Sequence, residues 1–177
     1  GVRPQTRPSS RAKPQSLATE RAVADTPTIS IYIAYTPAAL AVTPDIQGAI
    51  GLALADLRTT LDNSQISAQV TLAGSGLVNY AELENQSSDD MLNDAMIGAG
   101  DFARIRGLQK STGADMLSVW SVYSDNCGLA GGLYPNNDPN DVSLADAAYY
   151  QVSTIGAISD CGVGTFTHEV GHLLGAN

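Results

Sequence analysis

Hydrophobic residues recur along the chain at two spacings, which predict an alternation of strands and helices. Isoleucine occupies every second position within Thr28–Tyr35, which is typical of a strand with one face in the core, and Thr36-Pro37 ends the strand. Thr43-Pro44-Asp45 then precedes apolar residues three and four positions apart. This pattern predicts a long amphipathic helix that has Pro44 at its first position and ends near Asp62-Asn63.

The middle of the chain continues this alternation, with glycine-rich segments between its elements. Alternating apolar residues over Ile66–Leu72 predict a second strand, which Gly74-Ser75-Gly76 breaks before a short segment at residues 77–80. Ser88-Asp89-Asp90 has the composition of a helix cap and predicts a helix. After residues 98–100, apolar residues at helical spacing predict another helix.

Two further strands are predicted in the C-terminal half. Met116–Tyr123 is almost continuously apolar or aromatic, which is typical of a central strand covered on both faces, and it places Trp120 in the core. Ser124–Asp146 is rich in Gly, Asn, Asp and Pro, which predicts a long irregular loop. Tyr149–Ile158 is short, β-branched and aromatic, and it predicts an edge strand.

The composition divides the chain near residue 26. Residues 1–26 contain three prolines and five basic residues, which is typical of a disordered arm. This arm is either the tail of a removed propeptide or an unstructured leader, and because it lacks the apolar core of a secretory signal, any signal is expected to have been removed or omitted. Residues 27–177 are long enough for one globular domain, and the chain as a whole has an ordinary apolar content of 44%.

The charge of the chain argues against nucleic acid as a partner. The formal net charge is −9, and without residues 1–26 four basic and sixteen acidic residues remain, a net charge of −12. Nucleic-acid-binding proteins need clustered Lys and Arg to displace counterions. No stretch approaches the roughly 20 apolar residues of a membrane-spanning helix. We therefore expect neither nucleic acid nor a membrane as a partner.

His168-Glu169-Val170-Gly171-His172 is the segment that carries candidate chemistry, on a helix predicted to start near Gly164 or Thr165. Positions i and i+4 share one face of a helix, so two imidazoles can hold one zinc ion. Glu169 can reach a water on the metal without being a ligand itself. An accidental match on a plain helix face is the alternative, but these are the only two histidines in the chain.

Zinc chemistry gives each of these residues a role. A zinc ion lowers the pKa of its bound water from about 15.7 to about 7, so a carboxylate can take the proton at neutral pH. Glu169 is then the general base toward this water and the general acid toward the leaving amine. We therefore assign His168 and His172 as metal ligands and Glu169 as the catalytic residue.

Gly175 extends the motif and indicates its class. A glycine three residues past His172 can adopt the left-handed conformation that ends a helix and turns the chain back toward the metal. The pattern H-E-x-x-H-x-x-G-x-x-H belongs to the metzincins. Over about residues 28–177 the chain resembles the bacterial reprolysin-like, peptidyl-Asp metalloendopeptidase group. The other segments that carry this resemblance are Ile31–Pro37 with the long helix after it, Gly113-Ala114-Asp115, Cys127–Ala130, and Cys161 ahead of the motif.

The resemblance implies an α/β fold of the zincin (metzincin) type. Its upper subdomain has a twisted mixed sheet, an antiparallel edge strand that lines the substrate cleft, long helices, and an active-site helix beneath. Residues 27–177 would then be the catalytic domain without its C-terminal subdomain. The implied export to an oxidising compartment favours a disulfide between Cys127 and Cys161, with two buried thiols as the alternative.

Two departures from the family pattern concern the end of the motif. The third zinc ligand would be residue 178, one position past Asn177, and the methionine turn that follows it is also absent from the chain. A catalytic zinc usually has three protein ligands, so two histidines alone are expected to bind it weakly and leave the activity of the 177-residue form in question. Truncation of a longer enzyme is the favoured interpretation, and a C-terminal segment that completes the site is then a partner.

Two functions from different classes follow. The first is a secreted zinc endopeptidase that hydrolyses internal bonds of a peptide or protein substrate, which adds a strand to the sheet edge beside the metal. The second is a noncatalytic binding or adhesion domain that keeps the zincin fold with an incomplete metal site.

Overall fold

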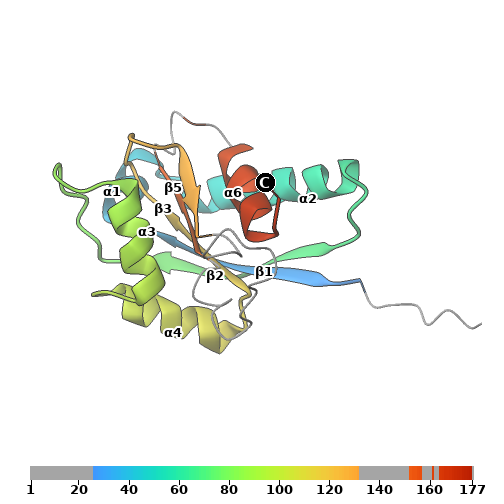
Figure 1. Cartoon of the computed structure of the whole chain (residues 1–177), viewed down its shortest axis with the longest axis horizontal. Helices are drawn as coiled ribbons and strands as arrows, with labels where there is room; N and C mark the ends of the chain where they lie inside the picture. The colour runs from blue at the N-terminus through green and yellow to red at the C-terminus, as the bar shows by residue number, and fades with distance from the viewer. Residues whose placement is uncertain (1–25, 132–151, 157–160, 162–163, 177) are drawn as a thin grey trace, which may run out of the picture.

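The structure is a computed structural model that describes residues 26–131, 152–156, 161 and 164–176. In this part of the chain five strands form one sheet in the order β2-β1-β3-β5-β4 (Figure 1). The strands are β1 (Thr28–Tyr35), β2 (Gln69–Leu77), β3 (Met116–Trp120), β4 (Gly128–Ala130) and β5 (Val152–Ile155). The helices are α1 (Pro37–Val42), α2 (Ile46–Asn63), α3 (Ser88–Ile97), α4 (Phe102–Thr112) and α6 (Gly164–Leu173). None of the helices in the described ranges is long and apolar enough to cross a membrane.

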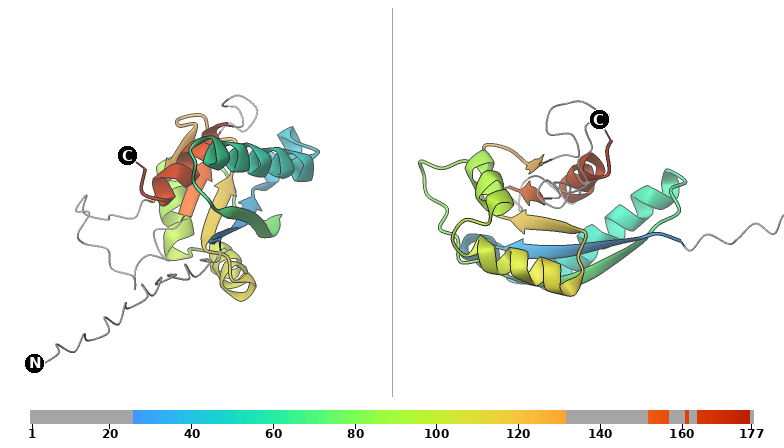
Figure 2. Two further views of the ribbon diagram at one scale, coloured as in Figure 1. Left: turned by 90° about the vertical axis from the view of Figure 1, so that its right-hand side faces the viewer. Right: turned by 60° about the horizontal axis from the view of Figure 1, so that its bottom comes forward.

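The sheet is mixed, and its one antiparallel pair lies at an edge. Strands β2, β1, β3 and β5 pair in parallel, whereas β4 pairs antiparallel with β5. The α/β fold with a mixed sheet and an antiparallel edge strand is thus confirmed. Helices α2 and α6 cover one face, and α3 and α4 cover the other (Figures 1 and 2).

The identity of the edge strand was predicted wrongly. Residues 152–155, within the predicted edge strand, form β5, which lies between β3 and β4. The edge is β4, a three-residue strand inside the segment predicted to be a loop. Such a short strand is stabilised by pairing with its neighbour, so its own residues show no alternation that could reveal it. Residues 132–151, the remainder of that loop and the start of the predicted strand, lie outside the described residues.

Helix starts differ from the predictions because the side-chain caps lie one or two residues away from the expected positions. Asp45 caps α2 by accepting a hydrogen bond from the Gly48 amide at 3.0 Å, so Pro44 precedes the helix. Ser87, not Ser88, caps α3 in a reciprocal capping box with Asp90. The short helix α1 was not predicted, and Thr36 caps it by accepting from the Ala39 amide at 3.1 Å, as well as ending β1.

Strand boundaries differ as well: β2 starts at Gln69 instead of Ile66, and the ends of β2 and β3 also differ. β2 runs through Gly74 to Leu77, because these glycines make room for the ring of Tyr32 on β1; a Cβ at Gly74 would lie 2.9 Å from that ring. The pairing with β1 shifts between Ile31 and Tyr32, which accommodates Ala73 as one extra residue in β2. β3 ends at Trp120 instead of Tyr123, since the Val122 amide donates to the Glu82 carboxylate and not to a neighbouring strand.

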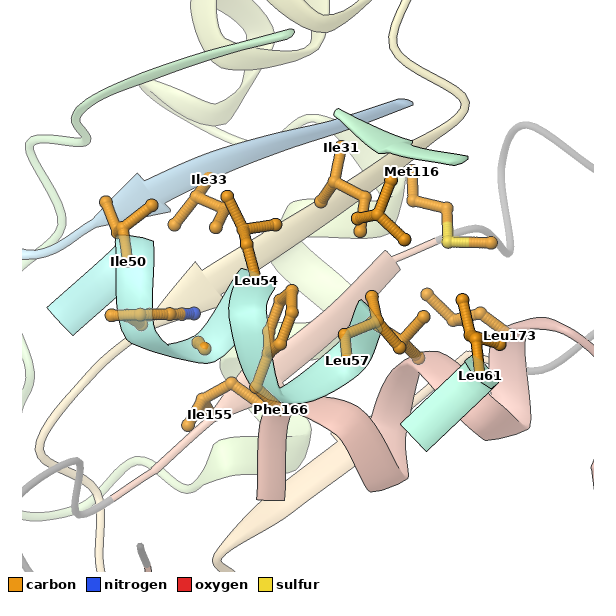
Figure 3. Close-up of a cluster of buried hydrophobic side chains, with 14 of the residues drawn as sticks. Ile31, Ile33, Ile50, Leu54, Leu57, Leu61, Met116, Ile155, Phe166 and Leu173 are labelled. Atoms are coloured by element: carbon orange, nitrogen blue, oxygen red, sulfur yellow. The ribbon is translucent and has the colours of Figure 1, made fainter. Parts of the chain in front are cut away.

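The core between α2, α6 and the sheet positions the active-site helix. All five residues of β3 are buried, which confirms it as a central strand. Trp120 is 2% exposed and meets Phe166 of α6 edge to face, with ring centroids 6.1 Å apart. Figure 3 shows Phe166 and Leu173 of α6 among the apolar side chains of α2 and the sheet. This packing fixes which face of α6 points away from the core.

Candidate active site

A disulfide joins the start of β4 to the entrance of α6. Cys127 and Cys161 are bonded, with their Cα atoms 5.4 Å apart, which confirms the predicted pairing. The Thr165 hydroxyl donates a hydrogen bond to the Cys161 carbonyl oxygen at 2.9 Å and so extends the connection into the first turn of α6. The edge strand and the active-site helix are therefore covalently linked at one end.

We expect removal of this disulfide to destabilise the fold. The two cysteines are 34 residues apart, for which the chain-entropy model gives roughly 3 to 4 kcal/mol. The double variant Cys127→Ser/Cys161→Ser should lose about this much free energy of unfolding in urea. Thiol titration of the denatured, unreduced parent supplies the control, and two free thiols in that parent would contradict the bond.

Apolar packing and one hydrogen bond set the rotation of α6 about its axis. Phe166, Val170 and Leu173 are buried against the sheet and α2. The Thr167 hydroxyl donates a hydrogen bond to the Asp56 carboxylate of α2 at 2.6 Å. Because these contacts occupy one side of the helix, His168 is left exposed and His172 half-buried on the other side.

The two histidines meet as the motif predicts. Their Nε2 atoms lie 3.0 Å apart, and the rings are close to perpendicular at 88°. Two nitrogens that bind one tetrahedral zinc ion at about 2.0–2.1 Å lie roughly 3.3 Å apart, so a shift of a few tenths of an ångström suits both to one ion. The two Nε2 atoms therefore fit two of the ligand positions of a zinc site.

A backbone carbonyl orients the second imidazole. Nδ1 of His172 lies 2.9 Å from the Ala176 carbonyl oxygen. Since a carbonyl only accepts hydrogen bonds, Nδ1 must carry the proton, and in the neutral ring Nε2 then has a free lone pair. A zinc-binding histidine usually donates its other ring N–H in this way. His172 is thus in the tautomer that metal binding requires.

Gly175 brings that carbonyl into place. Its φ of +92° lies in the left-handed region, which confirms the turn expected after the helix. The Gly175 amide donates to the His172 carbonyl oxygen at 3.0 Å, and the Ala176 amide donates to Gly171 at 2.9 Å. The turn therefore folds the chain back so that Ala176 faces the imidazole of His172.

Glu169 lies on the inner side of α6, beside β4. Its side chain is only 5% exposed, although it carries a carboxylate. This burial raises the pKa of Glu169 above its ordinary value, while the neighbouring His168 and His172 act in the opposite direction. The carboxyl group is therefore held next to the histidines in a site that favours its taking up a proton.

The third ligand is not among the described residues. Within those ranges no group of three or more His, Cys, Asp and Glu side chains is arranged so that it could hold one metal ion. The structure thus brings together the three predicted site residues, His168, Glu169 and His172, and adds none of the side chains that usually hold zinc.

Three residues of the site were missed by sequence reasoning. Asp56 lies 111 residues from its partner Thr167, and no local pattern marks such a pair. The Ala176 carbonyl is a backbone group, which the sequence does not distinguish. Gly128 of β4 lies so close to Glu169 that a Cβ there would be 2.6 Å from Oε1. It belongs to the segment Cys127–Ala130 that carries the family resemblance, and a glycine inside a strand is a known signal of close backbone approach.

Comparisons with known proteins find metallopeptidases among the proteins similar to this chain. A peptidyl-Asp metalloendopeptidase of Stenotrophomonas maltophilia strain K279a is 31% identical over 152 residues, and that of strain R551-3 is 29% identical. Each alignment covers 84% of this chain and 33% of the relative, so the chain spans a third of the length of these curated relatives. A chain in the structure of a chaperone-substrate complex has the same fold, with a TM-score of 0.66 at 16% identity over 85% of this chain and 24% of that one.

The family itself is established by a match to most of the chain. The sequence profile of the metallo-peptidase family M12B, reprolysin-like, matches residues 49–177, a range that runs from α2 through the zinc motif. The predicted metzincin resemblance is therefore confirmed. This chain belongs to the reprolysin-like M12B metallopeptidases.

Proposed function

We propose that residues 27–177 are the catalytic domain of a secreted zinc endopeptidase, in which His168 and His172 bind the metal and Glu169 transfers protons. The observation that carries the proposal is the pair of Nε2 atoms 3.0 Å apart beside a buried carboxylate. The family and the names of the relatives support hydrolysis of peptide or protein substrates. The disulfide and the family are compatible with an extracellular location.

The imidazole rings of the two histidines are held by different contacts. His172 is oriented by the Ala176 carbonyl, so its lone pair is directed toward His168 before any metal binds. His168 is exposed and its ring contacts the imidazole of His172, so His168 is the ligand whose position changes when the metal binds. When bound, zinc supplies Lewis acidity that polarises the scissile carbonyl and acidifies water.

Glu169 moves the proton. As a carboxylate it takes a proton from the attacking water, and as a carboxylic acid it delivers that proton to the leaving amine. Burial against β4 stabilises the protonated form, which suits a group that must hold a proton between these two steps. Glu169 does not need to bind the metal, so its role can be tested separately from metal binding.

The third ligand is part of the same proposal. The family motif places it three residues past Gly175, at position 178, in a segment that follows the described residues. The gathering of only two ligand side chains within the described residues favours, as a second candidate, a noncatalytic binding or adhesion domain. A peptidase assay of this chain together with any coding sequence that follows residue 177 separates these two functions.

We expect one zinc ion per molecule, bound through both histidines. His168→Ala and His172→Ala should each weaken zinc binding by at least about 10-fold, because each removes one of the ligands that hold the ion. Competition with a chromophoric chelator measures this affinity at fixed pH. Asp89→Ala, an exposed residue on the opposite face of the sheet, is the matched control and should bind as the parent does. Equal affinity in all four proteins would contradict the assignment.

A further inference from the structure

Glu169 lies in the space that a side chain at Gly128 would fill. A Cβ at Gly128 would be 2.6 Å from Cγ and from Oε1 of Glu169, and 2.8 Å from its Cδ. Real Cβ atoms essentially never approach another heavy atom closer than 3.0 Å. The carboxyl group of Glu169 therefore depends on a glycine at this position of the edge strand.

The backbone conformation does not explain this glycine. Among the described glycines with positive φ are Gly98, Gly113 and Gly175, whereas Gly128 is not one of them. Gly128 lies in a regular antiparallel pair with Ile155 of β5. Alanine would fit that conformation, so the close approach of Glu169 is the remaining structural reason for glycine.

The strand that carries Gly128 is firmly held. Cys127 is bonded to Cys161, and the Cys127 carbonyl accepts a hydrogen bond from the Gly156 amide at 2.9 Å. The backbones also approach closely just before β4, since a Cβ at Gly156 would lie 2.3 Å from the Asn126 carbonyl oxygen. If a side chain is added at Gly128, the flexible end of Glu169 must move, because the backbone of β4 is held in place.

Steric contact with Gly128 limits where the Glu169 carboxylate can lie. Glu169 is buried, and within the described part of the chain no hydrogen bond to its carboxylate is found. Among the described residues, the position of the carboxylate is therefore limited by the surfaces that enclose it. Cγ, Cδ and Oε1 of Glu169 occupy the space that a side chain on Gly128 would need, so the bare backbone of Gly128 leaves room for them.

We propose that Gly128 is a positioning residue for Glu169. Because Gly128 has no side chain, the Glu169 carboxylate can lie close to β4 while it stays beside His168 and His172. This inference rests on the proposed role of Glu169. Replacement by alanine displaces the carboxylate from the reacting water, and an error of about 1 Å in such a group costs up to about 10²-fold in rate. Zinc binding and substrate binding do not use the Glu169 carboxylate, so they stay unchanged.

The structural part of the test needs no activity. In a crystal structure of Gly128→Ala, Glu169 should have moved until its contact with the new Cβ reaches the ordinary 3.4 Å or more, with β4 in place. Gly128→Ala should also lower the melting temperature more when Glu169 is present than in a Glu169→Ala background, where nothing occupies the space. An unmoved carboxylate, or an equal effect in both backgrounds, would overturn the inference.

The functional part compares kcat with KM in zinc-loaded enzyme that includes any sequence following residue 177. Gly128→Ala should lower kcat by about 10- to 100-fold with KM and zinc affinity within two-fold of the parent. Gly107→Ala, whose added Cβ meets no atom within 4 Å, is the matched control and should keep kcat. If Glu169→Gln is inactive but Gly128→Ala is fully active, this inference fails and the proposed function stands; if Glu169→Gln is fully active, the proposed function fails first.

Discussion

Replacing Glu169 with Gln is expected to reduce peptide hydrolysis by about 10² to 10⁴-fold, which is the usual contribution of general acid and base catalysis. Glutamine has nearly the same shape as glutamate, so it fills the same space beside Gly128. It cannot take a proton from water or return one to the leaving amine. Zinc affinity should stay at the value of the parent, since the ligands are His168 and His172.

The measurement is a peptidase assay on an unfolded protein substrate with matched zinc loading. Both proteins carry any coding sequence that follows residue 177, because the third ligand is expected there. Glu84→Gln, the same chemical change at an exposed residue, is the control and should keep the parent's rate. A Glu169→Gln protein as active as its parent would exclude the proposed mechanism, even with zinc present. A fully zinc-loaded parent without activity would instead support the noncatalytic domain.

Replacing Phe166 with Ala is expected to lower the free energy of unfolding by about 3 to 5 kcal/mol. The ring is 2% exposed and packs against the edge of Trp120 and the leucines of α2 (Figure 3). Its removal leaves a cavity between the sheet and the two helices that cover this face, and a packed core collapses only partly around such a cavity. The effect should appear as a lower urea midpoint with an unchanged slope.

Trp120 makes this measurement direct. It is the only tryptophan in the chain and lies against the substituted ring, so its fluorescence follows unfolding of this core. Leu174→Ala is the matched control on the same segment, because Leu174 is 41% exposed and its removal should change stability by less than about 1 kcal/mol. A loss below this value for Phe166→Ala would show that Phe166 does not hold α6 against the sheet.

The elements that could be predicted from the sequence are those with a long periodic pattern or an unmistakable motif. β1 and the end of α2 lie where alternation and helical spacing place them, because their apolar residues pack into the core. The prediction that only one face of β1 lies in the core was wrong, since residues 31–34 are all buried and helices cover both faces of the sheet. α6 begins at Gly164, as expected. The disulfide followed from the count of cysteines together with the export that the family implies, and not from geometry. His168, Glu169 and His172 were found because their spacing on a helix already brings them to adjacent positions.

Tertiary contacts decided what short segments and single residues do. β4 is a strand because β5 lies beside it, and Gly74 lies within β2 because Tyr32 of the neighbouring strand covers it. Neither fact leaves a trace in local periodicity, since the partner residue is far away in the chain.

The same division holds for the site. The sequence alone determined which side chains can bind zinc and which can carry a proton, because these are properties of residue type and helical spacing. The local turn at Gly175 decided the protonated nitrogen of His172, through the Ala176 carbonyl, and only the tertiary structure decided how close Glu169 lies to β4, through the bare backbone of Gly128. The orientation of an imidazole and the burial of a carboxylate depend on what packs against them, and packing is a property of the folded chain.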